Sequence, residues 1–446
     1  MNEHATDRFG QWATRVVATT LIDFVLAAAV SILVLRLLGP EDAGRYAVWI
    51  VIPETLARFG VLGVPAANTY HVARQVEKLP GLIGNSLLMA GVLSLVVALA
   101  LAGYQALGGA VGDEGGVSGA VLAVLLLAFP GLMVAEMFRQ LMLGLGLIGS
   151  YNLQSVLANF LRVIGVLVLL VLLDGGLAGA LVAWSFGVIV AAVVGVMVVL
   201  RQSGWRCHVD RALLRGTLGF SARSYVASIT TFLNLRLDVY MLTALTAFDQ
   251  VGFYKAATSL TDRLWSLTGS VGTVLFARIA GTREERDRRL TAVVARLTLL
   301  FTLALSLLLL AISPWLVTLL YSATYAPAVV PLALLLPGVV AFALSQVLTS
   351  DIAGRGHPGY NAGASIAALV TNVVLNLLLV PPYGIAGAAL ATSLSFVLRA
   401  LLTLAIYARL ASARLRDVLI VKGNDWSLVK DSLMRFLPAG SSRTRH

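Results

Sequence analysis

Gly176-Leu177-Ala178-Gly179-Ala180 is followed 208 residues later by Gly384-Ile385-Ala386-Gly387-Ala388, a repeat that indicates two related halves. A second pair has the same offset, because Gly44-Arg45-Tyr46 is matched by Gly252-Phe253-Tyr254. Each stretch opens an apolar run, and each half of the chain contains six such runs. Since six crossings return a chain to its starting side, both halves enter the membrane from the same side. The sequence therefore predicts two six-helix lobes related by a parallel repeat, with the site between them.

The composition excludes an ordinary soluble domain. Apolar residues make up 59% of the 446 residues and charged residues 12%, with a mean hydropathy of +0.89. Soluble domains are about 45–50% apolar and about 25% charged. We therefore predict an all-α polytopic membrane protein with about twelve transmembrane helices. The predicted spans are residues 12–38, 44–71, 83–104, 118–143, 153–173, 176–200, 217–245, 252–278, 291–312, 328–350, 361–380 and 384–408.

Basic residues gather in alternate loops, which predicts that both termini are cytoplasmic in a bacterial inner membrane. The net charge of +11 is spread over these short loops and not over a solvated domain, so nucleic-acid binding is disfavoured. The predicted division is an N-terminal lobe over 1–205, a C-terminal lobe over 206–410 and a basic cytoplasmic tail over 411–446. In the tail, Trp426, Val429, Leu433 and Phe436 recur at helical spacing, which predicts an interfacial helix or a partner-docking helix.

Six arginines fall within the predicted spans: Arg58, Arg162, Arg223, Arg236, Arg263 and Arg399. A charge at the centre of a span costs roughly 2.5–3.5 kcal/mol on insertion scales, so such a residue faces protein or a watery cavity. Arg399 and Arg223 lie near the inner ends, where snorkelling reduces the cost. Guanidinium groups suit phosphate. The predicted substrate-binding residues are Arg58, Arg162, Arg223, Arg236 and Arg263.

Polar residues also recur along helix faces. The predicted faces are Arg15, Thr19 and Asp23; Ser224, Ser228, Thr231 and Asp238, with Arg236 off that face; and Lys255, Ser259, Arg263, Ser266 and Ser270. Four acids could bind a coupling proton or sodium ion: Asp23, Glu54, Asp238 and Asp262. Asp23 is favoured because no basic residue lies one turn beyond it. The alternative is structural pairing, such as Glu54 with Arg58 or Asp238 with Arg236.

Three stretches resemble one family. Leu37-Leu38-Gly39-Pro40-Glu41-Asp42-Ala43-Gly44-Arg45-Tyr46 resembles the signature after the first helix of oligosaccharide flippases of the polysaccharide-transporter type. The stretch 379–392 is similar to that family's connection between helices eleven and twelve, and the stretch 251–257 to its opening of helix eight. The resemblance spans residues 10–408. It implies the superfamily of multidrug, oligosaccharidyl-lipid and polysaccharide exporters, with V-shaped pairs of six-helix lobes and alternating access.

The resemblance further implies an antiporter-like flippase that moves an undecaprenyl-pyrophosphate-linked oligosaccharide to the outer leaflet. Membrane lipids, a proton or sodium ion, and polysaccharide assembly proteins are the other partners it suggests. The stretch from Pro53 to Arg58 is also similar to a helix-two motif of the lipid II flippase, with Ala57 replacing an arginine. That flippase has two extra helices that are not found here, so an O-antigen or exopolysaccharide flippase is the closer analogy.

Several other classes of protein are alternatives to this interpretation. A multidrug or other small-molecule exporter would share the fold, but the excess of deep arginines over deep acids disfavours export of cations. A major-facilitator carrier and a non-transporting scaffold are further alternatives. The connections are too short for a catalytic domain, there is no phosphate-binding loop with a Gly-Lys-Ser/Thr ending, and Cys207 and the five histidines are scattered. The sequence therefore predicts no enzyme, no cofactor and no metal site.

Overall fold

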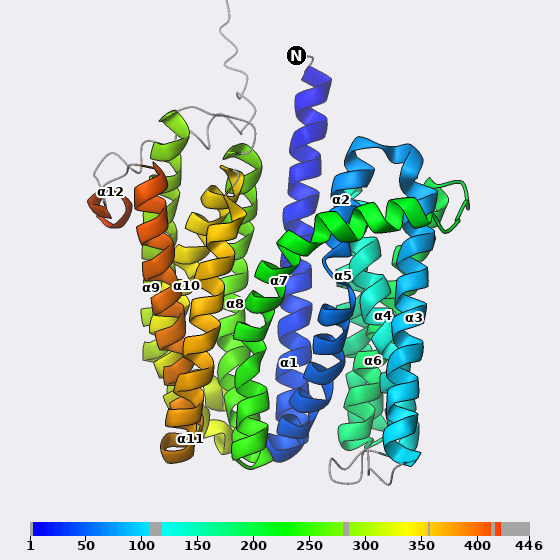
Figure 1. Cartoon of the computed structure of the whole chain (residues 1–446). Coiled ribbons are helices and arrows are strands. Elements are labelled where there is room, and N and C mark those ends of the chain that lie inside the picture. Colours follow the sequence, from blue (N-terminus) through cyan, green and yellow to red (C-terminus); the bar gives the residue numbers. More distant parts are fainter. Residues whose placement is uncertain (1–2, 107–117, 280–284, 356, 412–414, 421–446) are drawn as a thin grey trace, which may run out of the picture.

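The computed structural model describes residues 3–106, 118–279, 285–355, 357–411 and 415–420, and they form two helical bundles standing side by side (Figure 1). The first bundle contains α1 (Glu3–Gly60), α2 (Val64–Arg74), η1 (Val76–Lys78), α3 (Leu79–Ala106), α4 (Gly119–Gly144), α5 (Ile148–Val166), η2 (Leu167–Leu172) and α6 (Gly176–Gln202). The second contains α7 (Arg211–Leu245), α8 (Phe248–Ile279), α9 (Glu285–Leu320), η3 (Ala323–Ala328), α10 (Val329–Gly354), α11 (Pro358–Ala411) and α12 (Leu415–Leu419).

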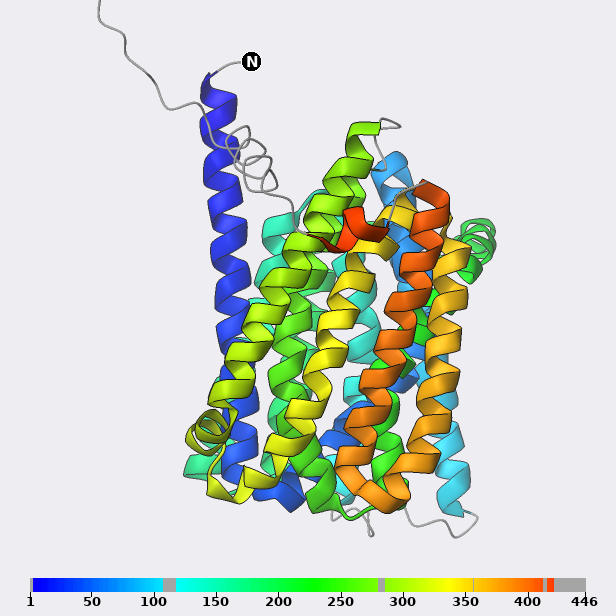
Figure 2. The same ribbon diagram turned by 90° about the vertical axis from the view of Figure 1, so that its left-hand side faces the viewer.

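Two of the longest helices are each divided by a glycine with a positive φ. Gly39 in α1 has φ 75° and ψ 173°, and Gly384 in α11 has φ 54° and ψ −132°. Glycine adopts such angles at little steric cost, and Pro40 then begins the next helical segment with a suitable φ. The chain reverses at both points, so α1 and α11 each cross the bundle twice (Figures 1 and 2).

These reversals reconcile the helices with the predicted number of spans. In the described part of the chain, eight helices are long and apolar enough to cross a membrane, and α1 and α11 are among them. Dividing those two at their kinks, and adding α7 and α8, gives the predicted twelve crossings. The helices α7 and α8 are not among these eight, and both carry charged residues within their spans, among them Arg236, Asp238, Lys255, Asp262 and Arg263. The predicted all-α, two-lobe fold is confirmed.

The second predicted span, residues 44–71, is broken where a continuous helix was expected. Leu62 (φ 47°) and Gly63 (φ 75°) form a turn between α1 and α2. Pro53, which was expected to bend this helix, lies within α1 without ending it. The turn lies against α7, because a Cβ atom added to Gly63 would stand 3.0 Å from the carbonyl oxygen of Ser221. The break therefore makes room for α7 to cross.

The two lobes meet at a seam, formed by the starts of the second and eighth spans, at the end opposite the N-terminus (Figure 1). A Cβ atom added to Gly44 would stand 1.8 Å from the carbonyl oxygen of Phe248, and one added to Gly252 would stand 1.9 Å from the carbonyl oxygen of Pro40. Gly44 and Gly252 are 208 residues apart, as are Pro40 and Phe248. The same contact is therefore made twice, once from each repeat. This reciprocity is what a two-fold axis between parallel repeats requires.

Apolar and polar contacts extend the seam. Ala43, Ala47 and Val51 of α1 share one buried hydrophobic cluster with residues of the C-terminal lobe. The hydroxyl of Tyr325 in η3 donates a hydrogen bond of 2.7 Å to the carbonyl oxygen of Leu35. The lobes are therefore closely packed at this end of the molecule.

The chain passes between the lobes along one end of the molecule. The first turns of α7 lie across the N-terminal lobe before the helix turns into the C-terminal lobe (Figure 1). Asp210 caps α7 by accepting from the Leu213 amide at 2.9 Å. Its own backbone exchanges two hydrogen bonds with the Asn85 side chain of α3. The predicted boundary at residues 205 and 206 stays a prediction, and the predicted helix at Trp426–Phe436 lies outside the described residues.

Candidate substrate cavity

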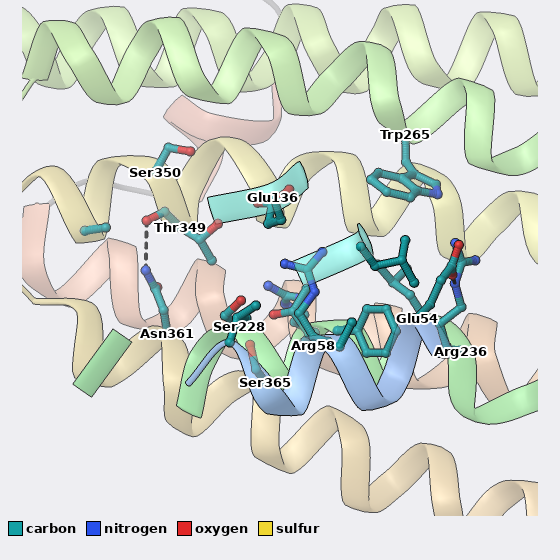
Figure 3. A pocket seen from close by; sticks show the side chains of 18 residues that line it. Glu54, Arg58, Glu136, Ser228, Arg236, Trp265, Thr349, Ser350, Asn361 and Ser365 are labelled. Carbon is teal, nitrogen blue, oxygen red and sulfur yellow. Dashed lines mark hydrogen bonds and ion pairs between the residues drawn. The ribbon is translucent and has the colours of Figure 1, made fainter. Parts of the chain in front are cut away.

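A cavity of about 710 Å³ lies between the two lobes. Helices α1 and α4 form its wall in the N-terminal lobe, and α7, α8, α10 and α11 form the wall in the C-terminal lobe. Figure 3 shows Thr349 and Asn361 at one end of this cavity and Glu54 and Arg236 at the other. Its polar lining residues are Glu54, Arg58, Glu136, Ser228, Thr231, Arg236, Trp265, Thr349, Ser350, Asn361, Ser365 and Arg399.

Cationic side chains outnumber acidic ones in this cavity. Three arginines, Arg58, Arg236 and Arg399, face two glutamates, Glu54 and Glu136. Arg58 lies with its Cζ atom 5.4 Å from the Phe232 ring centroid, a cation–π contact that leaves its hydrogen-bond donors directed elsewhere. The cavity therefore favours anions over cations.

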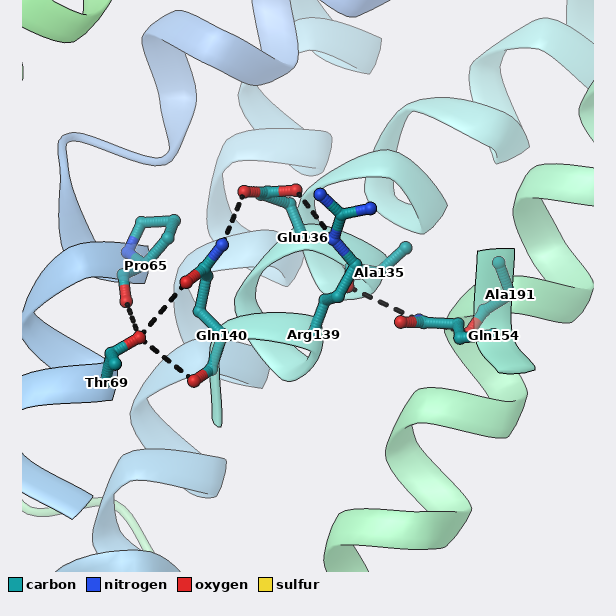
Figure 4. A network of polar contacts seen from close by, with 8 residues as sticks. All are labelled: Pro65, Thr69, Ala135, Glu136, Arg139, Gln140, Gln154 and Ala191. Atoms are coloured by element: carbon teal, nitrogen blue, oxygen red, sulfur yellow. Dashed lines mark hydrogen bonds and ion pairs between the residues drawn. The ribbon is translucent and has the colours of Figure 1, made fainter. Parts of the chain in front are cut away.

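Glu136 is held by its own helix, α4. Its Oε1 accepts from Gln140 at 3.3 Å, and its Oε2 lies 3.7 Å from Arg139 Nε (Figure 4). Gln140 is fixed in turn by the Thr69 hydroxyl, which lies 3.1 Å from its side-chain oxygen. Because Glu136 has these partners already, it neutralises little of the positive charge across the cavity.

Arg236 lies between two acids that occupy equivalent positions in the repeats. Its Nε is 3.7 Å from Glu54 Oε2, and its Nη1 is 3.6 Å from Asp262 Oδ2. Glu54 and Asp262 are 208 residues apart, so the arginine lies near the axis that relates the lobes. Glu54 belongs to the N-terminal lobe, and its contact with Arg236 therefore joins the two lobes. The alternative pairing of Glu54 with Arg58 is not made, and Arg236 pairs with Asp262 and not with Asp238.

A second, smaller cavity of about 310 Å³ shares Glu54, Leu235 and Arg236 with the larger one. Its cationic lining residues are Arg162, Arg236, Lys255 and Arg263, and its acids are Glu54 and Asp262. The predicted face of helix eight is confirmed for Lys255, Ser259 and Arg263, which all line this cavity. Cations exceed acids here too, so the bridge formed by Arg236 separates two basic cavities.

Arg263 is oriented by the first span. Its Nη2 donates to the Ala27 carbonyl oxygen at 2.7 Å, and its Cζ lies 5.7 Å from the Phe24 ring centroid. The predicted substrate residues Arg58 and Arg263 therefore lie in different cavities, with Arg236 common to both. The side chain of the fifth, Arg223, is not among those the structure describes.

A polar chain inside the N-terminal lobe connects α1 to α5. Asn159 donates to Asp23 Oδ1 at 2.8 Å, and Arg162 Nη1 donates to Asn159 Oδ1 at 3.2 Å. Thr19 accepts from Asn152 of α5 at 3.0 Å. The predicted polar face of helix one therefore packs against α5, at least for Thr19 and Asp23. Arg162 reaches the smaller cavity from this chain, with its Nε buried and making no hydrogen bond to any described residue.

The C-terminal lobe contains a buried carboxylate. Asp238 is 3% exposed and accepts hydrogen bonds from the Tyr254 hydroxyl at 2.6 Å, the Thr392 hydroxyl at 2.5 Å and the Asn376 amide at 3.2 Å. Asn372 donates to Thr392 at 3.2 Å. The helices α7, α8 and α11 thus surround one acid with neutral polar groups, and Asp238 lines neither cavity.

Two expectations about individual residues are corrected. Arg236, not Asp238, shares the cavity face of α7 with Ser228 and Thr231, because positions 228, 232 and 236 are one helical turn apart. Arg399 was expected to snorkel, but it is 4% exposed and lines the larger cavity. It is the functional candidate that the sequence argument missed. Its signal was available, since it is an arginine within a predicted span.

The sequence model of one family matches residues 13–283, more than half of the 446 residues, and its description is "Polysaccharide biosynthesis protein". The chain belongs to the polysaccharide biosynthesis protein family. The family match contains Arg58, Arg162, Arg236 and Arg263, whereas Arg399 lies beyond it.

One relative is also described by a role in glycan biosynthesis. A probable low-salt glycan biosynthesis flippase of Haloferax volcanii is 22% identical over 192 residues. That match covers 42% of this chain and 41% of the relative, so the two proteins are matched over less than half of their lengths.

Solved structures of transporters share the fold. The lipid II flippase MurJ in an inward closed conformation has a TM-score of 0.76 at 13% identity, covering 97% of this chain and 93% of that one. An inward-facing multidrug resistance transporter of the MATE family in the MOP superfamily has a TM-score of 0.70 at 16% identity, covering 89% and 98%. A MOP superfamily transporter from Pyrococcus furiosus, described as having a binding pocket of reverse polarity, has a TM-score of 0.68 at 16% identity, covering 92% and 96%.

Proposed function

We propose that this protein is a flippase that carries an undecaprenyl-diphosphate-linked oligosaccharide across the cytoplasmic membrane by alternating access. The observation that carries the proposal is the excess of guanidinium groups in two connected cavities between the lobes. Buried arginines at membrane depth are costly and typical of sites that bind anions. A cationic drug would meet repulsion in the same cavities, so export of such drugs is disfavoured. The family description and the glycan-related relative support the choice of a lipid-linked sugar.

The residues suggest how the substrate is held. Arg58 of the N-terminal lobe and Arg236 of the C-terminal lobe both face the larger cavity, and guanidinium forks match diphosphate oxygens. The sugar occupies the remaining space beside Trp265, whose ring offers an apolar face. The polyprenyl chain stays in the lipid. With the termini cytoplasmic, the seam at Gly44 and Gly252 closes the outer end, and the substrate enters from inside.

The bridge at Arg236 gives a reason for the lobes to move. A diphosphate that takes Arg236 competes with Glu54, the acid from the other lobe that lies 3.7 Å away. Release of Glu54 removes a link between lobes in the substrate-bound state. A ligand shifts a conformational equilibrium only by such a difference in contacts.

An ion is proposed to couple transport to a gradient. Asp238 is a stronger candidate than Asp23, because it is buried and its partners are two hydroxyl groups and an amide, neutral groups that leave a proton or a sodium ion free of competition from a fixed cation. Asp23 accepts from Asn159 and lies close to the Arg162 chain, so a cation there would meet positive charge. We expect Asp238→Asn to abolish the response of flipping to a proton or sodium gradient, and Asp23→Asn to retain it.

The test is flipping of an undecaprenyl-diphosphate-linked oligosaccharide by purified protein in proteoliposomes. Arg58→Gln and Arg236→Gln are expected to lower the rate by at least about tenfold, since each removes a charge-assisted contact worth about 1.5–3 kcal/mol. Arg201→Gln, at the exposed end of α6, removes the same group outside both cavities and is the matched control. Wild-type protein that does not flip the lipid would overturn the proposal, and full activity in both variants would remove these arginines from the site.

A further inference from the structure

Part of the larger cavity's wall has polar groups that lack partners. Arg399 of α11 is 4% exposed, and its Nε and Nη1 make no hydrogen bond with the described residues. Ser365, on the preceding span of the same element, is 1% exposed, and its hydroxyl is unpartnered in the same sense. Asn361 donates to the Thr349 carbonyl oxygen at 2.8 Å, which fixes the amide and leaves its Oδ1 buried without a donor. All three residues line the cavity.

No acid among the described cavity residues is placed to neutralise Arg399. Glu54 lies against Arg236, and Glu136 lies against Arg139 and Gln140. The nearest aromatic partner is Phe342, whose ring centroid is 5.0 Å from the Arg399 Cζ atom. A ring face attracts the cation but accepts none of its N–H groups in their plane. A buried guanidinium with unpaired N–H groups is unfavourable unless an anion completes it.

We infer that Arg399, Ser365 and Asn361 form a subsite for an oxyanion on the sugar of the substrate, namely the carboxylate of an acidic sugar. This inference rests on the proposed function. The arginine presents a fork that matches a carboxylate, the serine hydroxyl donates to the same group, and Asn361 Oδ1 accepts from a neighbouring sugar hydroxyl. Figure 3 shows Asn361 at the end of the cavity away from Glu54 and Arg236. The acidic sugar and the diphosphate therefore occupy different parts of one cavity.

The experiment compares two synthetic undecaprenyl-diphosphate disaccharides that differ only in the terminal sugar, glucuronic acid or glucose. Flipping by wild-type protein at subsaturating lipid is expected to be roughly ten- to a hundredfold faster for the acidic disaccharide. Charge-assisted hydrogen bonds to its carboxylate strengthen binding by about this factor. Arg399→Gln is expected to slow the acidic lipid more than the glucose lipid and to bring the ratio of the two rates to about one. Arg399→Lys keeps the charge but not the fork, and gives an intermediate ratio. Arg409→Gln, exposed on the same helix, is the control.

The outcomes separate this inference from the proposed function. Equal rates for the two lipids in wild type would overturn the inference while the flippase stands. An equal slowing of both lipids by Arg399→Gln would assign Arg399 to the shared diphosphate, which also overturns it. If the purified protein does not flip lipid, binding can be measured directly. We expect free glucuronic-acid disaccharide to raise the melting temperature of the detergent-solubilised protein more than its glucose counterpart does. Loss of that difference in Arg399→Gln supports the subsite even if flipping fails, and its absence from wild type refutes it.

Discussion

The two lobes differ in charge at one buried position, because the C-terminal lobe buries Asp238 where the repeat places Val30 in the N-terminal lobe. The backbone repeat that relates the lobes makes the difference informative. Tyr254 donates to Asp238, but Tyr46, 208 residues earlier, has no carboxylate to meet because Val30 stands where the repeat would place one. Likewise Thr392 donates to Asp238, and its counterpart is Trp184, beside Arg162. The repeats kept their shape and diverged in charge.

The difference separates the proposed coupling site from the substrate cavities. Asp238, buried away from both cavities, suits a coupling cation, whereas the arginines of both lobes that line the cavities suit an anionic substrate. The seam shows the opposite behaviour, since Gly44 and Gly252 make the same contact from both sides. Substitutions at the seam are therefore expected to act symmetrically, and substitutions in the polar clusters asymmetrically.

The largest expected effect is at the seam. Gly44→Ala and Gly252→Ala each place a methyl group within 2 Å of a backbone oxygen, so the lobes must separate. Overpacking of this kind costs about 1–3 kcal/mol, which corresponds to a loss of closed state of roughly five- to 150-fold. We expect both variants to slow flipping to a similar extent. Gly91→Ala in α3, where an added Cβ has open space, is the control.

Accessibility gives a second readout of the seam. In a Cys207→Ser background, a cysteine placed at Ala47, which is 5% exposed in the seam cluster, is expected to react faster with a membrane-impermeant maleimide when either glycine is substituted. A strong effect from one glycine and none from the other would break the symmetry on which the comparison rests.

A smaller effect is expected inside the lobes. Tyr254→Phe removes the 2.6 Å hydrogen bond to Asp238, and a bond to a charged group contributes about 1.5–3 kcal/mol to stability. The repeat-equivalent Tyr46→Phe removes a hydroxyl that forms no hydrogen bond with the described residues, so its cost stays below about 0.5 kcal/mol. Chemical unfolding in detergent measures both. Equal losses of stability would show that the lobes do not differ as inferred.

The two-lobe repeat could be predicted from the sequence, whereas the contact at the seam and much of the cavity could not. The repeated Gly-x-Tyr at one offset predicts two related lobes, but only the structure shows that each of these glycines meets the backbone of the other lobe. The face of Lys255, Ser259 and Arg263 followed from helical spacing along one straight helix. Both predictions, of the repeat and of this helix face, depend only on the spacing of residues along the chain.

The errors arose where the answer depends on neighbouring helices. On α7, spacing alone admits two polar faces, and only packing against α8 and α11 decides that Asp238 turns inward and Arg236 faces the cavity. Arg399 lies close enough to a helix end to snorkel, yet Phe342 of α10 packs beside it and closes the route. The pairing of Glu54 with Arg236 joins residues 182 positions apart, which no periodicity within a helix can reveal.

The smallest expected effect concerns the bridge that Arg236 forms with Glu54 and Asp262. Glu54 and Asp262 occupy equivalent positions and lie at similar distances from Arg236, but only Glu54 belongs to the other lobe. All three side chains are 26–28% exposed, so each pair is partly screened and contributes about 0.2–1 kcal/mol. Glu54→Gln frees Arg236 for substrate, and we expect the KM for the lipid-linked oligosaccharide to fall by up to about fivefold.

Asp262→Asn serves as the matched variant, because it removes the same charge from the same arginine without unlinking the lobes. Asp262 also accepts from the Trp265 indole at 2.9 Å, a bond that asparagine can keep through its side-chain oxygen. We therefore expect the KM to fall in both variants, whereas maleimide labelling at the seam changes only with Glu54→Gln. If labelling changed equally in both, the charge on Arg236 alone would control the seam, and the link between lobes would have no separate role.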